Sequence, residues 1–328
     1  MDRLKSNTVE LHAAGGQSAQ GARPDQEDEY IIVTPGGSLS EIGDSIALFA
    51  VFDGHGTGIV SNHAKEHIPL LLFESDEFKN GSYEQAMQAA IDKEDELLLQ
   101  GFREGQNFFA TSGSTASLAL VDMKKGVLVV GNIGDSHILM AERDPETGQV
   151  KSIERLTTSH KPESPDEKAR IEKAGGHVHS HHDISRIGSL NMSRALGDLQ
   201  YKTPLISAAA APKTEGQKVA TAPEPQDASA QDGAQAGTGR DDFITVEMSF
   251  RWIDLHKEKQ YLLALTTDGV TNALDDGKIM NGIAQMFNAG KQANEVARTV
   301  VDQASSTEYA DNATCVAVFL NGAEAKLV

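Results

Sequence analysis

The chain has 328 residues, of which 39% are hydrophobic, and a formal net charge of −19 from 48 acidic and 29 basic side chains. This hydrophobic content supports a sizeable core and excludes wholesale disorder. The acidic excess argues against a nucleic-acid partner, because binding to a phosphate backbone demands a basic face.

No apolar run approaches the length of a membrane span, and the polar start of the sequence carries no secretory signal pattern, so we expect no membrane partner. The single cysteine, Cys315, lies in an apolar run that is typical of a core strand, and it cannot form a disulfide within the chain. We therefore expect a reducing location, the cytoplasm or the nucleus.

Residues 1–20 have little hydrophobic pattern and predict a flexible leader. Beyond them, short runs rich in Val, Ile, Leu and Phe, bounded by Gly, Asp or Asn, predict strands. The expected strands are Glu29–Thr34, Ser45–Phe52, Ser114–Val121, Val127–Ile133, His137–Ala141, Phe243–Met248, Tyr261–Thr267 and Ala313–Leu320. Turn residues at Asp122–Gly126 and Gly134–Ser136 predict hairpins, and hence antiparallel pairing.

Helices are predicted mainly from their ends. Ser82 and Gln85 match a capping box, and Ser164 with Pro165 begins a helix that ends at Gly175. Further helices are expected at Asp276–Phe287, at Ala293–Ser305 and around His63 and His67, two residues interpreted as surface or helix-packing side chains. Runs of strands with helices between the runs indicate an α+β fold.

Residues 207–242 differ from the rest of the chain. They are rich in Ala, Pro, Gly, Gln and Asp, contain no aromatic residue, and include Val219 as the one large aliphatic side chain. Such a composition cannot offset the entropy of ordering, and it predicts a disordered insertion. We expect one domain at 21–322 that this insertion interrupts, followed by a C-terminal tail at 323–328.

Short polar clusters lie at the ends of the strand-like runs. They are Arg23–Asp28, Asp53–Gly56, Gly134–Ser136, Thr267–Gly269 and Asp311–Thr314. Each cluster alone is more typical of a turn or a solvated edge than of a functional site. Carboxylates without Cys or paired His ligands are hard oxygen donors, which favour Mg²⁺ or Mn²⁺ over structural zinc.

Taken together, the clusters resemble the type 2C protein phosphatases, the metal-dependent PPM superfamily. The motifs that carry the resemblance are, in order, Arg23-x-x-x-Glu27-Asp28, Phe49-Ala-Val-Phe-Asp53-Gly-His-Gly56, Ser112-Gly-Ser-Thr-Ala116, Gly131-Asn-Ile-Gly-Asp135-Ser136, His160-Lys-Pro162, Ser193-Arg-Ala-Leu-Gly-Asp198, Thr267-Asp-Gly269 and Asp311-Asn-x-Thr314. They extend over roughly residues 21–320. The resemblance implies a four-layer α/β/β/α sandwich of two antiparallel sheets flanked by helices, with a dinuclear metal site at one edge.

The resemblance also implies a role for each matching residue. Asp53 would bridge two Mg²⁺ or Mn²⁺ ions. Glu27 and the Gly54 carbonyl would help to hold one of these ions, and Asp268 and Asp311 would hold the other. Asp135, with Asp268, would match a weaker third metal position. Asp28 would orient metal-bound water, Arg23 would clasp the substrate phosphate, and His55 would protonate the leaving group. Physically, two cations lower the pKa of a bridging water, and an Arg fork matches two phosphate oxygens.

Two further segments resemble parts of that family. The histidines at 177, 179, 181 and 182 indicate an exposed polar loop rather than a second metal site. By its position this loop resembles the flap of the family, which lies beside the cleft. Arg194 and Asp198 resemble a structural pair beside the site.

The resulting expectation is a monomeric, metal-dependent protein serine/threonine phosphatase that acts on phosphorylated proteins. The alternatives are a non-catalytic binding module with the same fold, a phosphatase for small-molecule phosphate esters, and an unrelated cation-binding structural protein.

Overall fold

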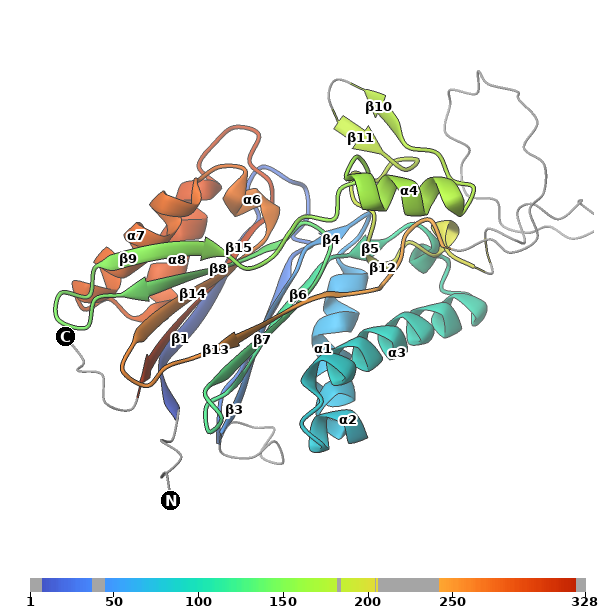
Figure 1. Ribbon diagram of the computed structural model, residues 1–328. Coiled ribbons are helices and arrows are strands. Elements are labelled where there is room, and N and C mark those ends of the chain that lie inside the picture. Colours follow the sequence, from blue (N-terminus) through green and yellow to red (C-terminus); the bar gives the residue numbers. More distant parts are fainter. Residues whose placement is uncertain (1–7, 37–44, 182–183, 204, 206–241, 323–328) are drawn as a thin grey trace, which may run out of the picture.

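The computed structural model describes residues 8–36, 45–181, 184–203, 205 and 242–322. Two five-stranded antiparallel sheets pack face to face, and helices cover the outer face of each sheet, as Figure 1 shows. The α+β class and the four-layer sandwich are therefore confirmed. Within the described ranges, no helix is both long and apolar enough to cross a membrane.

Each large sheet is assembled from segments that are distant in the sequence. Across the first sheet the order is β1 (Val9–Ala19), β15 (Ala313–Gly322), β14 (Gln260–Thr266), β8 (His137–Arg143) and β9 (Val150–Arg155). Across the second it is β13 (Ser249–Asp254), β7 (Val127–Ile133), β6 (Ala116–Asp122), β3 (Ile46–Phe52) and β2 (Glu29–Val33). The described residues also form two small sheets: β12 (Leu196–Gly197), β5 (Gly113–Ser114) and β4 (Gly54–His55) make one, and β10 (His179–His181) and β11 (Ile184–Arg186) make the other.

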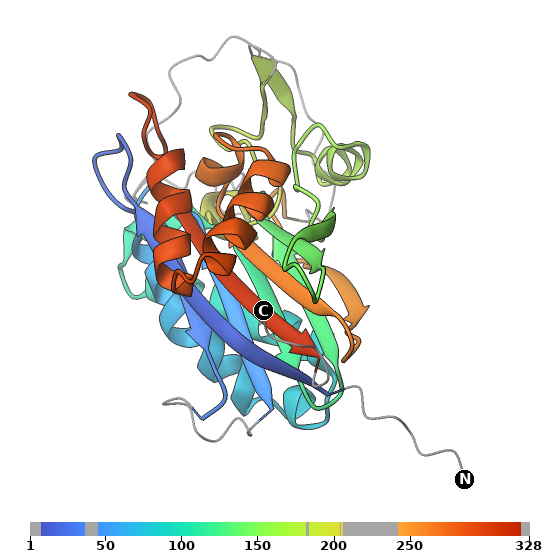
Figure 2. The same cartoon turned by 90° about the vertical axis from the view of Figure 1, so that its left-hand side faces the viewer.

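The helices form the two outer layers. On the second sheet lie α1 (Ile59–Glu74), α2 (Asp76–Lys79) and α3 (Tyr83–Arg103); on the first lie α6 (Asp268–Thr271), α7 (Asp276–Asn288) and α8 (Ala293–Ala304). Figure 2, turned by 90°, shows α7 and α8 in front of the first sheet. Helix α4 (Pro165–Lys173) lies beside β10 and β11, and two short 3₁₀ turns occur at Asn107–Ala110 and Leu199–Tyr201.

Strand β3 shows why its sequence is an unbroken apolar run. Successive side chains of a strand point to opposite faces. Leu48, Ala50 and Phe52 pack in the core beneath α1 and α3, whereas Phe49 and Val51 pack between the two sheets. Both faces are buried, so every position is apolar, and each large side chain contributes roughly 1.5–3 kcal/mol. This rigid central strand carries Asp53 at its end.

The predicted flexible leader is wrong for most of its length. Residues Val9–Ala19 form β1, which pairs with β15 along nearly the whole strand. Its composition is small and polar because the strand lies at a sheet edge and because Gly15 and Gly16 approach neighbours closely. An added Cβ would lie 2.3 Å from the backbone nitrogen of Asn294 at Gly15 and 2.5 Å from the Tyr30 ring at Gly16.

Two other expectations are also wrong. The turn at Gly134–Ser136 joins no hairpin, because β7 and β8 belong to different sheets and the chain crosses between them there. The strand expected at Phe243–Met248 lies further along, at Ser249–Asp254. Ile244 instead packs with Ile171 and its neighbours in a small separate core. The hairpin at Asp122–Gly126 is confirmed by the pairing of β6 with β7.

The predicted helices are present, with two differences at their ends. Helix α3 begins after Ser82, but the Ser82 side chain accepts no capping hydrogen bond. Helix α8 does have a capping box, between Gln292 and Glu295, which the sequence reading did not identify. The predicted insertion and the C-terminal tail lie outside the described residues, apart from Asp242.

Candidate active site

Five aspartates from both sheets lie at one edge of the sandwich. They are Asp28 before β2, Asp53 after β3, Asp135 after β7, Asp268 after β14 and Asp311 before β15. Burial raises the pKa of Asp53 well above its usual range, and the charges of the other four raise it further. Because such effects require short separations, the structure brings all five predicted aspartates into one centre.

Asp53 and Asp28 form the interior of this centre. The backbone of Asp53 is fixed by Thr115, whose hydroxyl accepts from the Asp53 amide (3.0 Å) and whose amide donates to the Asp53 carbonyl (2.9 Å). Oδ2 of Asp28 accepts hydrogen bonds from Thr267 (2.7 Å) and Thr314 (2.8 Å). Burial nevertheless raises the pKa of Asp28 to about 7, because these two hydroxyls only partly compensate for lost water.

Asp268 and Asp135 lie on another side of the centre. Burial raises the pKa of Asp268 to about 6, and the charges of Asp135 and Asp311 add to this. The ammonium of Lys161 pairs with Oδ2 of Asp135. Lys161 therefore supplies positive charge where the resemblance places a metal ion.

Arg23 and Asp311 form an ion pair at the rim, 2.6 Å from Nη2 to Oδ2. The Arg23 side chain is 55% exposed, so the guanidinium lies where a solvent-borne phosphate can reach it. In this structure Arg23 binds a predicted metal ligand, and it must turn from Asp311, or bridge it, to clasp a phosphate.

Glu27 and Gly54 are brought into contact through their backbones. A Cβ at Gly54 would lie 2.3 Å from the Glu27 carbonyl oxygen, so only glycine permits this approach. The Glu27 amide donates to the side chain of Asn312 (2.8 Å), next to Asp311. Burial is the main cause that raises the pKa of Glu27.

His55 is held by the carboxylate of Asp198, which was expected to pair with Arg194 instead. Its Nε2 lies 2.7 Å from Oδ2 of the fully buried Asp198. Burial alone would lower the pKa of His55, but the charge and hydrogen bond of Asp198 outweigh it and raise that pKa. Gly113, opposite His55 in the β4–β5 pair, makes room: a Cβ there would lie 2.2 Å from Asp198 Oδ2.

The chemistry of the donors fits hard divalent cations. Every predicted ligand offers oxygen, as Mg²⁺ and Mn²⁺ prefer. Asp28 and Asp135 each retain one buried carboxylate oxygen that has no hydrogen-bond partner among the described residues. Unpaired buried carboxylates are costly unless positive charge offsets them. The predicted ligands therefore form a centre that bound cations would stabilise.

A hollow of about 230 Å³ opens beside Asp268, lined by Lys161, Ile184, Ser185 and Asn191 among others. Ile184 and Ser185 belong to β11, so the β10–β11 hairpin borders the centre, in the position expected of the flap. His177 and His179 are exposed there, as predicted, but His179 and His181 belong to strand β10 and not to a loop, and His182 lies outside the described residues.

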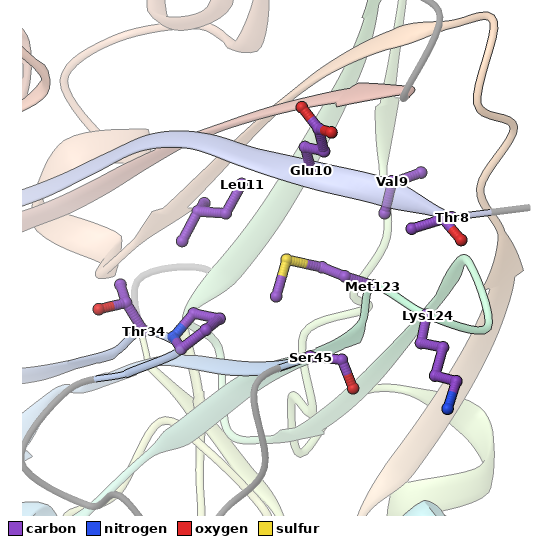
Figure 3. Close-up of a pocket in the computed structure, with 9 residues that line it drawn as sticks. Thr8, Val9, Glu10, Leu11, Thr34, Ser45, Met123 and Lys124 are labelled. Atoms are coloured by element: carbon purple, nitrogen blue, oxygen red, sulfur yellow. The ribbon is translucent and has the colours of Figure 1, made fainter.

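The larger hollow, about 760 Å³, is unrelated to this chemistry. It lies at the opposite end of β3, where Ser45 precedes the strand whose other end carries Asp53. Figure 3 shows the Met123 thioether between β1 and the residues Thr34 and Ser45. None of its lining residues belongs to the acidic centre.

Several functional neighbours were missed from the sequence. These neighbours are Lys161, Thr267, Thr314 and Asn312. All four belong to the motifs given above, but a motif does not specify which atoms contact one another. The expected pair of Arg194 with Asp198 is wrong. Arg194 instead binds Glu167 on α4, with 3.0 Å from Nε to Oε1, while Asp198 binds His55.

The family model for protein phosphatase 2C matches residues 13–313, and the chain belongs to that family. "Protein phosphatase 2C 1" of Paramecium tetraurelia is 37% identical over 191 residues, which cover 56% of this chain and 58% of the relative. The match thus spans less than two thirds of that relative. "Probable protein phosphatase 2C 5" of the same organism is 28% identical over 312 residues, covering 91% of this chain and 89% of the relative.

Solved structures agree on the fold. The serine-threonine phosphatase 2C of Toxoplasma gondii superposes with a TM-score of 0.72 at 21% identity, covering 96% of this chain and 98% of that one. A sex-determining protein of C. elegans gives 0.70 at 22% identity, covering 94% of this chain and 64% of that one.

Proposed function

We propose that this protein is a Mg²⁺- or Mn²⁺-dependent phosphatase that hydrolyses phosphoserine and phosphothreonine in protein substrates. The observation that carries the proposal is the buried cluster of Asp28, Asp53 and Asp268, whose pKa values burial and mutual repulsion raise. Family membership supports the reaction class, and the oxygen-only donor set supports the choice of cation.

Within this proposal, Asp53 would contact both cations. Glu27 and the carbonyl of Gly54 would hold one cation, and Asp268 with Asp311 the other. Asp135, with Asp268, would serve a weaker third position, from which Lys161 would have to withdraw. When bound, such cations lower the pKa of water and neutralise the oxygens of the transferring phosphoryl group.

Arg23 is the group of this chain that binds the phosphate. Its guanidinium forms a planar fork of donors that matches two phosphate oxygens, which a lysine would not reproduce. Its partner in the structure, Asp311, is itself a carboxylate, so the side chain already lies where an anion is recognised.

His55 is the group that protonates the leaving oxygen. A serine or threonine alkoxide is a strong base and leaves phosphorus with difficulty unless it gains a proton. Asp198 orients the imidazole through Nε2, and Nδ1 has no hydrogen-bond partner among the described residues. Nδ1 is buried here, so under this proposal the imidazole must shift to bring Nδ1 to the leaving oxygen.

The test is turnover of a phosphothreonine peptide with and without metal. EDTA should abolish turnover, and excess Mn²⁺ or Mg²⁺ should restore it, because the predicted ligands are the hard oxygen donors that hold these cations. Turnover that persists in metal-free buffer would refute the proposal. Tight metal binding without turnover would identify a binding module, and turnover of small phosphate esters alone would exclude protein substrates.

A further inference from the structure

Three metal-ligating side chains meet outside the acidic centre, between α1 and α3. His63 and His67 lie one turn apart on α1, and Glu94 faces them from α3 with a fully buried side chain. Figure 1 shows these two helices packed together on the outer face of the second sheet. Nδ1 of His63 lies 2.5 Å from Oε1 of Glu94 and 3.0 Å from Nδ1 of His67.

The polar contacts inside this cluster are short. Nδ1 of His63 and Oε1 of Glu94 share one hydrogen, which either of them can carry. Nδ1 of His67 lies 3.0 Å from Nδ1 of His63 and 2.9 Å from the His63 carbonyl, which already accepts the helical hydrogen bond of the His67 amide. Two imidazole nitrogens and a carboxylate therefore converge on one point between the helices.

Glu94 adds a second, independent observation. Its Oε2 is buried and has no hydrogen-bond partner among the residues that the structure describes. Nδ1 of His67 is 3.8 Å from this oxygen, which is too far for a hydrogen bond. An unpaired oxygen of a buried carboxylate is costly, and it points to a cation as its partner.

The spacing of the donor atoms suits a small tetrahedral ion. Zinc bonds of about 2.0–2.1 Å to nitrogen and oxygen place the ligand atoms of a tetrahedron about 3.3 Å apart. The two imidazole nitrogens are 3.0 Å apart, and the carboxylate of Glu94 lies 2.5 Å from one through Oε1 and 3.8 Å from the other through Oε2, so it would turn to present one oxygen at that spacing. Two histidines at i and i+4 on one helix face are a recurring zinc-binding arrangement.

We propose that His63, His67 and Glu94 form a zinc site that links α1 to α3, with water as the fourth ligand. Imidazole nitrogens favour zinc over Mg²⁺ or Ca²⁺, so the site differs from the acidic centre in the metal it selects. The histidine side chains are 26% and 37% exposed, which gives the ion a path from solvent and leaves room for the water. His67 must release the His63 carbonyl to coordinate the ion.

Hydrogen bonds from both helices connect the site to segments of the acidic centre. On α1, the hydroxyl of Ser61 donates to the carbonyl of Glu27. On α3, Asp95 accepts from the amide of Gly197 (2.8 Å), next to the partner of His55. Zinc would therefore brace the helices that support the centre. The inference rests on the cluster itself and does not depend on the proposed phosphatase activity.

The test is Zn²⁺ binding to the full chain in excess Mg²⁺, which occupies the oxygen-donor centre. Competition with a chromophoric chelator gives the stoichiometry and affinity, and zinc-edge X-ray absorption reports the ligands. We expect one tightly bound Zn²⁺ with imidazole scattering and a rise in melting temperature. His67→Gln and Glu94→Gln should each weaken binding at least about tenfold, whereas Glu66→Gln, an exposed carboxylate on the same helix, should not.

Because the His67 side chain is partly exposed, we expect the His67→Gln variant to fold, and circular dichroism of the metal-free variants checks this. Equal zinc binding by wild type and His67→Gln would overturn the proposal and place the zinc elsewhere, such as on the exposed His177 and His179. An absorption spectrum with oxygen ligands alone, or no tight zinc in excess Mg²⁺, would also overturn it.

Discussion

The acidic centre buries two carboxylate oxygens, and the His63–His67–Glu94 site buries one, that have no hydrogen-bond partner among the described residues, yet the remaining donors of the two sites differ. Around Asp53 the donors are carboxylates at strand ends, and the nearby cations Arg23 and Lys161 pair with two of them. Around Glu94 the partners are two imidazoles on one helix, whose Nδ1 atoms lie 3.0 Å apart.

The difference shows that donor chemistry, and not burial alone, determines what a cluster can bind. Crowded carboxylates repel one another and attract hard divalent cations that neutralise several charges at once. A pair of imidazoles with one carboxylate carries less charge and favours zinc. The predictions below test this contrast in order of expected effect.

The largest effect is expected from Asp53→Asn. The amide cannot bridge two cations, so turnover should fall by about 10³-fold or more, because the metals supply several kcal/mol of transition-state stabilisation. The melting temperature of the metal-free protein should not fall, since one repulsive charge leaves a crowded centre. Zinc binding at Glu94 should be unchanged. The exposed Asp25→Asn serves as the control.

A smaller and more selective effect is expected from His55→Gln. Hydrolysis of a phosphopeptide should slow by about 10²–10⁴-fold, because the alkoxide needs a proton as it leaves. Hydrolysis of p-nitrophenyl phosphate should slow far less, because its leaving group is a weak base. Asp198→Asn should show the same dependence on the leaving group to a lesser degree. Equal losses on both substrates would remove His55 from the proton transfer.

The smallest effect on turnover is expected from Glu167→Gln, away from both clusters. Burial alone would raise the pKa of Glu167, but Arg194, followed by Ser193 and Arg170, outweighs it and lowers that pKa to about 2. Its ion pairs therefore stabilise the fold fully above pH 4.5, and this stability is lost as pH falls from 4.5 towards 2. The variant should be less stable by about 1–3 kcal/mol at neutral pH.

Urea unfolding at several pH values measures this difference. The gap between wild type and Glu167→Gln should narrow as the pH falls below 4.5. A gap that stays constant down to pH 2 would show that the charge of Glu167 does not stabilise the fold.

The central strands could be predicted from sequence because burial on both faces makes them continuous apolar runs, as in β3 and β14. The missed strands β1, β9 and β13 lie at sheet edges. An edge strand has one neighbour and a solvated face, so it tolerates Gly, Lys, Glu and Arg and lacks a clear pattern. The crossing at Gly134–Ser136 was missed because a turn motif does not specify the partner of the next strand.

The acidic residues of the candidate site could be predicted because the motifs preserve their order and spacing. Their contacts could not, since these depend on segments far apart in sequence. Asp198 reaches His55 across 143 residues, and Thr314 reaches Asp28 across 286. The Glu94 cluster was missed because its histidines and its carboxylate lie on different helices, and the histidines alone suggested packing.

The most direct test of the acidic centre is Mn²⁺ binding followed by electron paramagnetic resonance, with wild type and Asp53→Asn in parallel. Two Mn²⁺ ions that share a carboxylate lie close enough to couple magnetically. We predict two coupled ions per chain in the wild type, and at most one uncoupled ion at this centre in Asp53→Asn. Uncoupled ions in the wild type, or a coupled pair that survives in Asp53→Asn, would contradict the assignment of Asp53 as the bridge.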